Sequence, residues 1–261
     1  MVWRFYESNA REMPWRSHRT AYRILVSEIM LQQTSVPRVM GRYSAFIRAF
    51  PSFRRLAASS VEQVIGAWKG LGYNRRALAL RDSARLITTE FHGRLPRTVD
   101  ELVRLPGVGR ATAAAVIVYT FNIPLAFIET NIRRVFLHTF FPRDVDVPDS
   151  LLLPLVEKTM DLENPRDWYY ALMDYGTSLA TELTSGGNPN RRGRSYKVQS
   201  RFEGSLRQLR GKVLAMMLQR KAASMAQIGE LLDADPRLAE ALRQLVDEGF
   251  LCLRGGSYSF R

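Results

Sequence analysis

The feature that most constrains the fold of this chain is a succession of helical patterns broken by glycine and proline turns. Apolar residues recur at helical spacing over residues 22–34 and 75–91, and small apolar residues fill 112–119. Further helices are expected after a cap at Ser59 or Ser60, after Thr98 up to Pro106, and over 131–140 and 168–183. Few segments alternate like strands before residue 249. The sequence therefore predicts a mainly α fold.

The last sixty residues have a different pattern. A helix is expected over residues 202–219, and the capping box at 224–227 opens a second helix through 232. Asp235 and Pro236 are expected to cap and start a third helix, which ends at Gly249. Residues 250–253 and 257–260 then form a hairpin. Three helices and a hairpin are typical of a winged helix, and the alternative is a helical cap that binds nothing.

The charge of the chain indicates a polyanionic partner. Lysine and arginine number 38 against 25 acidic residues, which gives a net charge of +13. Residues 191–221 hold ten basic residues and one acid, Glu203, so this window supplies nine of those thirteen charges. The run begins in a loop-like stretch at 185–190, where Arg191, Arg192 and Arg194 suit contact with phosphate. Nucleic acid is the first expectation and an anionic membrane surface the second, and the alternative for the basic run is a solvated face.

Composition excludes several classes of protein and cofactor. Cys252 is the one cysteine, so the chain has no internal disulfide and no four-thiolate zinc or iron–sulfur site. The histidines are three and scattered, so no metal site is expected. No apolar run reaches the ~20 residues that span a bilayer, and the N-terminus lacks the apolar core of a signal peptide. We expect a soluble cytoplasmic monomer with no membrane partner.

A glycine-rich turn between two expected helices fits contact with a phosphate backbone. Leu105 and Pro106 lead into Gly107, Val108 and Gly109, and Arg110 follows. Glycines allow close approach, and the amides and dipole of the next helix face an anion. The turn is predicted to bind phosphates without reading sequence, and the alternative is an ordinary helix–helix turn.

Two acids in different settings are the candidates for chemistry. Glu28 lies in an otherwise apolar helix, where burial should raise its pKa. Glu129 lies at a helix start near two arginines, so we expect it to be ionised with no raised pKa. The alternatives are a surface Glu28 and simple capping by Thr130 or Asn131. Gln32 and Gln33 offer amides that can probe base edges.

Four motifs in this order resemble the helix-hairpin-helix DNA glycosylases, most closely the adenine DNA glycosylases (MutY-like). They are E-I-M-L-Q-Q-T-S-V at 28–36, W-K-G-L-G-Y at 68–73, L-P-G-V-G-R-A-T-A at 105–113 and I-E-T-N-I-R-R-V at 128–135. The resemblance implies two helical lobes with a cleft over residues 1–184. A basic linker at 185–202 and a winged-helix-like module at 203–261 would follow.

The resemblance also implies roles for individual residues. Glu28 stands where the family's acid protonates the departing purine, and Glu129 stands where an aspartate stabilises the sugar cation. Asn131 matches an asparagine beside that aspartate. Gln32, Gln33 and Tyr73 match residues that wedge into the duplex or contact the mispair. Glycosidic cleavage indeed needs one neutral and one ionised carboxyl.

The chain departs from the family pattern at four places. Glu129 is one methylene longer than aspartate, and Ala111 replaces the lysine of bifunctional relatives, which argues against a lyase. The cluster cysteines are missing, so no iron–sulfur cluster is expected, and a monovalent cation at the hairpin is the one ion left open. A winged-helix-like module stands in place of the usual 8-oxoguanine-reading domain.

These observations predict a monofunctional DNA N-glycosylase of base excision repair. It would act on double-stranded DNA with a mispair or lesion, flip the base and hydrolyse its bond, with adenine opposite 8-oxoguanine or guanine as the expected target. The alternatives are a glycosylase for mismatched thymine or uracil and a non-catalytic protein that binds distorted DNA. DNA binding would place the protein at the nucleoid.

Overall fold

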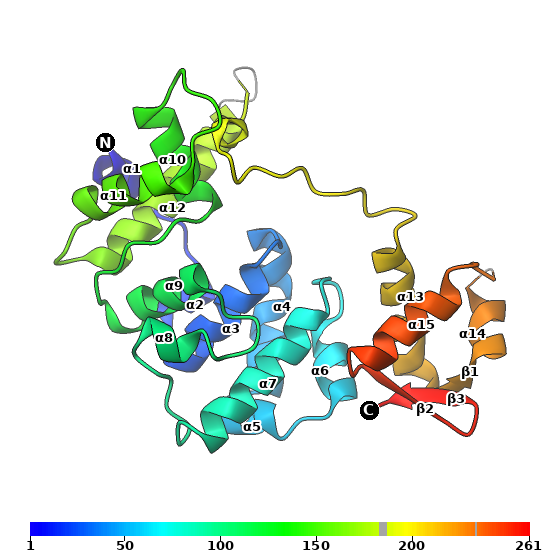
Figure 1. The fold of residues 1–261 in the computed structure, drawn as a ribbon. Helices are drawn as coiled ribbons and strands as arrows, with labels where there is room; N and C mark the ends of the chain where they lie inside the picture. Colours follow the sequence, from blue (N-terminus) through cyan, green and yellow to red (C-terminus); the bar gives the residue numbers. More distant parts are fainter. Residues whose placement is uncertain (183–186, 233) are drawn as a thin grey trace. The chain divides into compact units, whose positions relative to one another are not determined.

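The computed structural model describes residues 1–182, 187–232 and 234–261, and it is mostly helical, as the sequence predicts (Figure 1). Within these ranges no helix is both long and apolar enough to cross a bilayer. The chain divides into two compact units. Unit 1 holds Met1–Glu28, Arg97–Arg104 and Val108–Val198, and unit 2 holds Ile29–Pro96, Leu105–Gly107 and Gln199–Arg261.

Unit 1 combines the N-terminal helices with the helices that follow residue 96. Its core joins α10 to α12 and α1 to α12, with buried aromatic residues of α12 at the centre. The elements of this unit are α1 (Val2–Asn9), α2 (Pro14–Ser17), the first part of α3 (Ala21–Leu31), α8 (Val99–Leu102), α9 (Arg110–Phe121), α10 (Thr130–Phe140), α11 (Asp149–Thr159), α12 (Pro165–Glu182) and the 3-10 helix η1 (Pro189–Arg192).

Unit 2 combines the middle helices with the C-terminal segment. The α5 and α7 pair and the α4 and α6 pair form its first layer, in which Trp68 and Phe46 are fully buried. The elements are the end of α3, α4 (Val36–Ala49), α5 (Phe53–Ala57), α6 (Val61–Trp68), α7 (Arg75–Thr89), α13 (Leu206–Arg220), β1 (Ala222–Ser224), α14 (Met225–Leu231), α15 (Leu238–Asp247), β2 (Leu251–Arg254) and β3 (Ser257–Phe260).

The C-terminal elements have the order of a winged helix. The predicted hairpin is present as β2 and β3, and β1 adds a third antiparallel strand, so the sheet order is β1-β3-β2. The sequence analysis missed β1, because three residues between two helices carry no alternation signal. In unit 2 helix α13 packs against α6, and Lys221 forms an ion pair with Glu62. The module therefore shares one folding unit with the middle helices.

Local sequence explains most helix boundaries. The predicted cap at Ser60 is a complete capping box with Gln63, and the one at Ser224 is complete with Gln227. Helix α3 ends three residues earlier than predicted, and Gln33 then turns the chain with φ 53°. Helix α6 ends before Gly70, which has φ 93°.

Two C-terminal helix starts were predicted wrongly. Helix α13 begins at Leu206 rather than 202, because the Ser205 hydroxyl caps it by accepting from the Gln208 amide. Helix α15 begins at Leu238, so Asp235 is no helix cap: its carboxylate accepts from the Arg237 amide at 3.0 Å and pairs with the Arg237 guanidinium. The acid therefore stabilises the turn before the helix.

The predicted domain boundaries stay predictions. Residues 183–186, which include the predicted helix end at 183, the boundary at 184 and the start of the loop at 185–190, lie outside the described part of the chain. The rest of the basic linker is divided, because Val198 ends the last segment of unit 1 and Gln199 begins the last segment of unit 2.

One close helix contact in unit 1 positions the residues that matter below. Helices α10 and α12 lie side by side, and Gly176 sits against the backbone of Asn131 (Figure 1). A Cβ at Gly176 would come within 2.8 Å of the Asn131 Cβ and closer still to the Asn131 carbonyl oxygen. The absence of a side chain at Gly176 thus sets the distance between the two helices.

Gly176→Ala is expected to lower the free energy of unfolding by about 3 kcal/mol, because the added methyl forces α10 away from α12. Gly41 is a matched control, since it lies exposed inside α4 with no atom within 4 Å of an added Cβ. Gly41→Ala should raise the free energy of unfolding by up to about 1 kcal/mol. Urea unfolding measures both, and equal effects of the two substitutions would contradict the close contact.

Candidate active site

Glu28 is the only acid on α3 and lies among apolar neighbours. Ile24, Leu25 and Ile29 on the same helix are fully buried, while Glu28 is half-buried. Among the described residues no hydrogen bond or ion pair reaches its carboxyl. Burial first, and the negative charge of Glu129 second, raise the pKa of Glu28 to about 8. The expectation of a raised pKa is confirmed, and this carboxyl is protonated at neutral pH.

Glu129 caps helix α10 with its own side chain. Its Oε1 accepts hydrogen bonds from the Asn131 amide at 2.6 Å and the Ile132 amide at 2.8 Å. The alternative of capping by Thr130 or Asn131 is therefore wrong. The expected pKa is also wrong, since burial raises the pKa of Glu129 while the two amides, Arg134 and Arg133 oppose the rise.

The two acids lie in each other's field and differ in their partners. The charge of Glu129 raises the pKa of Glu28, so the two carboxyls interact electrostatically. Glu129 accepts hydrogen bonds from N–H groups, which favour its anion, whereas Glu28 has no such donor. Like charges held together do not both ionise readily, so the proton stays on Glu28. The pair thus combines a protonated Glu28 with a Glu129 whose two amide donors favour its anion, and the ionisation of Glu129 stays a prediction.

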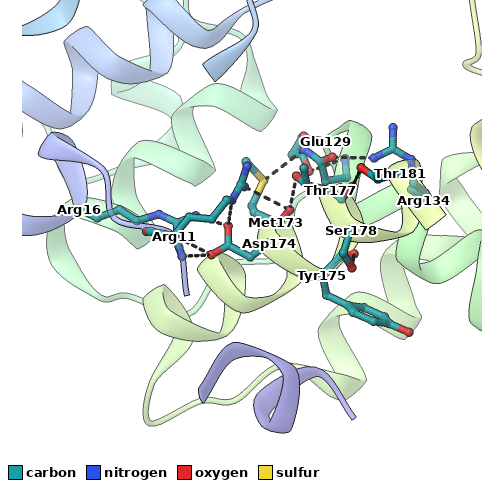
Figure 2. Close-up of polar contacts among 11 residues, drawn as sticks. Arg11, Arg16, Glu129, Arg134, Met173, Asp174, Tyr175, Thr177, Ser178 and Thr181 are labelled. Atoms are coloured by element: carbon teal, nitrogen blue, oxygen red, sulfur yellow. Dashed lines mark hydrogen bonds and ion pairs between the residues drawn. The ribbon is translucent and has the colours of Figure 1, made fainter. Parts of the chain in front are cut away.

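Asn131 holds Glu129 in place and is itself held by Arg134. Figure 2 shows Glu129 and Arg134 at this site. The Asn131 Nδ2 donates to Glu129 Oε2 at 3.3 Å, and its Oδ1 accepts from Arg134 Nη1 at 2.8 Å. The same Arg134 Nη1 donates to the Gly176 carbonyl at 2.6 Å. The buried guanidinium therefore ties the cap of α10 to α12, and Asn131 lies beside the acid as predicted.

The sequence analysis missed a pair of buried tyrosines beside the acids. The rings of Tyr119 on α9 and Tyr170 on α12 stack at 4.8 Å with 6° between their planes. The charge of Glu28 raises the pKa of both phenols, in addition to the larger effect of burial. The Tyr170 hydroxyl is buried without a hydrogen-bond partner among the described residues. A buried orphan donor beside a reactive acid is a candidate contact for a ligand.

A second missed cluster anchors the N-terminal segment. Asp174 is buried, and Arg11 and Arg16 converge on its carboxylate (Figure 2). Arg16 makes two hydrogen bonds to it, at 2.7 and 2.8 Å, and its guanidinium lies 4.3 Å from the centre of the Tyr170 ring. Although burial raises it, the pKa of Asp174 is lowered overall by Arg16 and Arg11. The cluster fixes Arg16 over the tyrosine stack.

The glycine turn has the geometry that its sequence suggests. Gly107 has φ 78°, and an added Cβ would meet the Ala79 Cβ at 3.0 Å, so a side chain there would be strained. Gly109 is the N-cap of α9 and offers no side chain to cover the first amides. Val108 is buried, and Arg110 pairs with Asp100 in the solvent. The first turn of α9 is therefore open to an anion.

In unit 2, Gln32 and Gln33 lie in the turn after α3, and Tyr73 lies in the turn after α6. Arg76 joins these two turns. The buried Arg76 guanidinium donates to carbonyl oxygens at the end of α3, including those of Ile29 and Met30 at 2.9 and 2.8 Å, and to that of Gly72 at 3.1 Å. Burial lowers the pKa of Arg76 to about 10. The Gln32 amide donates to the Gly107 carbonyl at 3.0 Å. Arg76 thus organises both turns.

The arginines of the basic run are partly engaged. Arg194 pairs with Asp146 at 2.7 Å, and Arg192 donates to the Pro142 carbonyl. Arg191 is exposed, with no side-chain partner in the described ranges. Of the three predicted phosphate contacts, Arg191 is the one with a side chain free to make it.

The described residues do not fit an iron–sulfur cluster. Such a cluster takes four thiolates, and the single thiol of this chain, Cys252 Sγ, lies in β2 at 3.3 Å from Ser259 Oγ. No group of three or more His, Cys, Asp or Glu side chains in the described ranges could hold a metal ion. The cation at the hairpin stays a prediction.

Comparison with known proteins agrees with the motifs. Residues 26–152 match the HhH-GPD superfamily of base excision DNA repair proteins. The adenine DNA glycosylase of Mycolicibacterium smegmatis is 34% identical over 236 residues, which are 82% of this chain and 78% of that protein. The chain belongs to the adenine DNA glycosylase family. The human adenine DNA glycosylase is 34% identical over 68% of this chain, but over only 35% of its own length.

Solved structures of this superfamily share the fold. A thermostable thymine-DNA glycosylase has a TM-score of 0.60 and 28% identity, over 67% of this chain and 82% of that one. An endonuclease III–DNA complex has a TM-score of 0.56 and 19% identity, over 66% and 80% of the two chains.

In this adenine DNA glycosylase family member, Ala111 and Ile128 line a cavity of about 430 Å³ in unit 1. The residue before Glu129 is thus accessible to a small ligand.

The raised pKa of Glu28 predicts how stability depends on pH. The folded state keeps a proton that the unfolded state releases near its ordinary pKa of 4.5, so the free energy of unfolding falls as pH rises from 4.5 to about 8. Glu28→Gln removes this loss. The free energy of unfolding of the variant minus that of the parent, measured by urea unfolding, should therefore increase between pH 5 and pH 8.

Glu129→Gln is the companion variant in that series. It removes the charge that raises the pKa of Glu28, so the loss of stability with pH should become smaller. Asp174 is unchanged in all three proteins, so its contribution cancels. A pH dependence identical in the parent and in Glu28→Gln would show that Glu28 has an ordinary pKa.

Proposed function

We propose that this protein is a monofunctional DNA N-glycosylase that removes a mispaired base by hydrolysis. The observation that carries the proposal is a protonated Glu28 in the field of Glu129, whose carboxyl accepts hydrogen bonds from two backbone amides in unit 1. Hydrolysis of a glycosidic bond needs an acid for the leaving group and negative charge near the cationic sugar. Membership of the adenine DNA glycosylase family supports the same assignment.

Each carboxyl has one role in the reaction. Glu28 donates its proton to a ring nitrogen of the base, and the bond from C1′ to the base breaks with its electron pair leaving on the base. Glu129 stays ionised and stabilises the positive charge that develops on the sugar. Water then adds to C1′ and returns a proton to Glu28. Ala111 supplies no amine, so no Schiff base forms with this residue.

The tyrosine stack would form one wall for the flipped base. Tyr119 and Tyr170 lie in the field of Glu28, and the unpartnered Tyr170 hydroxyl can donate to a nitrogen or oxygen on the base edge. Both rings are buried, so they would limit the access of water to the base. Because the base must leave the helix stack at a cost of a few kcal/mol, these contacts would offset part of that cost.

DNA would be held through its phosphates. The open first turn of α9 after Gly109, together with Arg191, provides backbone contacts that position the duplex without reading its sequence. A duplex with a mispair is therefore the proposed partner. The monomeric state and the cytoplasmic location stay predictions.

Adenine opposite 8-oxoguanine or guanine is the proposed target. The relatives named above are adenine DNA glycosylases, whereas the thymine-DNA glycosylase is similar in fold at 28% identity, which keeps thymine opposite guanine as the second candidate. A protein that binds distorted DNA without cutting it is the third, since Glu129 is longer than the aspartate of the family pattern.

A single-turnover excision panel tests the proposal. The duplexes carry adenine opposite 8-oxoguanine or guanine, thymine or uracil opposite guanine, or normal pairs, and alkali reveals excision as a strand break. We expect cutting at adenine, and a rate at least about 100-fold lower for Glu28→Gln because the proton donor is lost. Binding of a non-cleavable duplex should stay within about threefold, since this carboxyl does not hold phosphate.

Glu7→Gln is the matched control, because Glu7 is exposed on α1. The parent rate should also fall as pH rises through about 8, where Glu28 loses its proton. Tight binding with no strand break on any duplex would favour the non-catalytic protein. Normal cutting by Glu28→Gln would refute the assignment of the acid.

A further inference from the structure

A short segment that follows α12 in the chain packs against the first turns of α10. It covers residues 188–195 and includes the 3-10 helix, and we call it the η1 segment. Asn190 and Gly193 are buried, whereas residues 194–200 are exposed. The reaction proposed above uses Arg191 of this segment as a phosphate contact and gives its buried residues no role.

Asn190 connects the η1 segment to the residue that follows Glu129. Its Nδ2 donates to the Thr130 carbonyl at 3.1 Å. Asn188 fixes Asn190 in turn, because the Asn188 Oδ1 accepts from the Asn190 backbone amide at 3.1 Å. A carbonyl oxygen has two lone pairs, so it can accept this bond in addition to a helix hydrogen bond. The start of α10 is therefore tied to a second segment of the chain.

Gly193 brings the η1 segment against the same face of α10. An added Cβ at Gly193 would meet Arg133 Cδ at 3.2 Å and Leu137 Cδ1 at 3.3 Å. Thr130, Arg133 and Leu137 follow the i, i+3, i+7 spacing of one helix face. The contacts of Asn190 and Gly193 thus cover the first two turns of α10 along one side.

An ionic link holds this side of α10 as well. The Arg133 guanidinium makes two hydrogen bonds to the Asp149 carboxylate, at 2.8 and 2.6 Å. Ser195, at the end of the η1 segment, donates from its Oγ to Asp149 Oδ2 at 3.3 Å. Arg133 lowers the pKa of Asp149, so this carboxylate stays charged at neutral pH. One carboxylate at the start of α11 therefore joins α10 to the η1 segment.

The other side of the η1 segment is attached to the loop between α10 and α11. Val147 and Gly193 form a parallel bridge. In this bridge the Val147 amide donates to the Arg192 carbonyl at 2.8 Å, and the Arg194 amide donates to the Val147 carbonyl at 2.9 Å. The Arg194 guanidinium pairs with Asp146 at 2.7 Å. The η1 segment is thus held on two sides within unit 1.

Glu129 is bound to the first turn of α10 by its main chain and by its side chain. Its carbonyl accepts from the Arg133 amide at 2.8 Å. Its carboxyl accepts from the Asn131 and Ile132 amides. Because both ends of the residue are bound to that turn, a contact that fixes the turn also fixes the carboxyl.

The two polar atoms of the Asn190 side chain are used unequally. The residue is 3% exposed, and its Oδ1 is buried without a hydrogen-bond partner among the described residues, whereas its Nδ2 reaches Thr130. A buried acceptor without a donor costs free energy that an apolar side chain of similar size would not incur. The amide at residue 190 therefore supplies a specific contact at a cost in stability.

We propose that the η1 segment is a positioning element for base excision, in which Asn190 is a positioning residue that fixes Glu129 through the Thr130 carbonyl. This inference rests on the proposed function. Helix α12 holds the same turn from another direction, through the contact of Gly176 with Asn131. A displacement of about 1 Å in a catalytic site can lower a rate about 100-fold, so the position of the Glu129 carboxyl relative to the sugar must be held closely.

Asn190→Ala tests this role, because it removes the Nδ2 donor and leaves both acids in place. Single-turnover excision of adenine opposite 8-oxoguanine, with the enzyme in excess, should be at least about tenfold slower than in the parent. The affinity for a duplex with a non-cleavable adenine analogue should change by less than about threefold, since the buried Asn190 side chain offers no phosphate contact.

The titration of Glu28, followed by ¹³C NMR, reports the position of Glu129 without any excision. The charge of Glu129 contributes to the pKa of about 8 at Glu28, and this effect weakens with distance. In Asn190→Ala the first turn of α10 is held less firmly, so the pKa of Glu28 should fall below its value in the parent. A merely structural Asn190 would change the free energy of unfolding and leave this titration unchanged.

Asn122→Ala is the matched control. The Asn122 side chain also donates to a backbone carbonyl in unit 1, that of Glu163 at 3.4 Å, but it joins the end of α9 to the chain before α12. Its loss should lower the free energy of unfolding and leave both the single-turnover rate and the Glu28 titration as in the parent.

Gly193→Ala keeps the test valid if Asn190→Ala does not fold. Its methyl group would press on Arg133 and Leu137 and move the η1 segment away from α10 while the Asn190 amide is kept. The excision rate and the pKa of Glu28 should both fall, as in Asn190→Ala.

Three results would overturn the inference. They are an unchanged rate in the folded variants, a slower rate with an unchanged Glu28 titration, and equal changes in Asn122→Ala. A parent protein that cuts no duplex would refute the proposed function instead. The titration would then decide alone whether the η1 segment positions Glu129.

Discussion

Two carboxyl groups that interact electrostatically in unit 1 determine what this site can do. If both were ionised they would repel each other, and if both were protonated neither could stabilise a cation. The backbone resolves this by giving donors to one of them. Glu129 receives the Asn131 and Ile132 amides at the start of α10, while Glu28 faces apolar residues and receives none. This unequal supply of donors favours the anion of Glu129 over that of Glu28.

The packing of helices in unit 1 preserves that difference. Gly176 lets α12 approach the backbone at Asn131, and Arg134 joins Asn131 to the Gly176 carbonyl. On the same helix, Asp174 holds Arg16 over Tyr170, whose ring stacks on Tyr119 near both acids. Unit 2 contains a different kind of lining. Arg76 fixes the turns that carry Gln33 and Tyr73, and both residues line a cavity that has cations and aromatic rings but no acid.

Sequence reasoning found what depends on local chemistry. Features that depend on neighbouring residues alone could be predicted. They are the caps at Ser60 and Ser224, the glycine turn and the C-terminal hairpin. Glu28 stood out because it is an acid in an otherwise apolar helix. Glu129 stood out because it is an acid at the start of a helix. Helices α4 and α11 were not predicted: Pro154 stands inside α11, whereas Pro37 in the first turn of α4 is compatible with a helix start. Their stability comes from packing that no local pattern shows.

Features that join distant residues could not be predicted. The Tyr119 and Tyr170 stack, the bonds of Arg207 to Tyr73 and the Asp174 cluster each connect residues far apart in the chain. The pKa of Glu129 was misjudged for the same reason, because burial by residues outside its helix outweighs the local amides and arginines. Composition and spacing contain no information on such burial.

The most direct test is ¹³C NMR of the glutamate side-chain carboxyls, with resonances assigned by their loss in Glu28→Gln and Glu129→Gln. At pH 7 the resonance lost in Glu28→Gln should be that of a protonated carboxyl and should titrate near pH 8, while the one lost in Glu129→Gln should be that of a carboxylate. A Glu28 resonance that is already ionised at pH 6 would contradict the division of roles between the two acids.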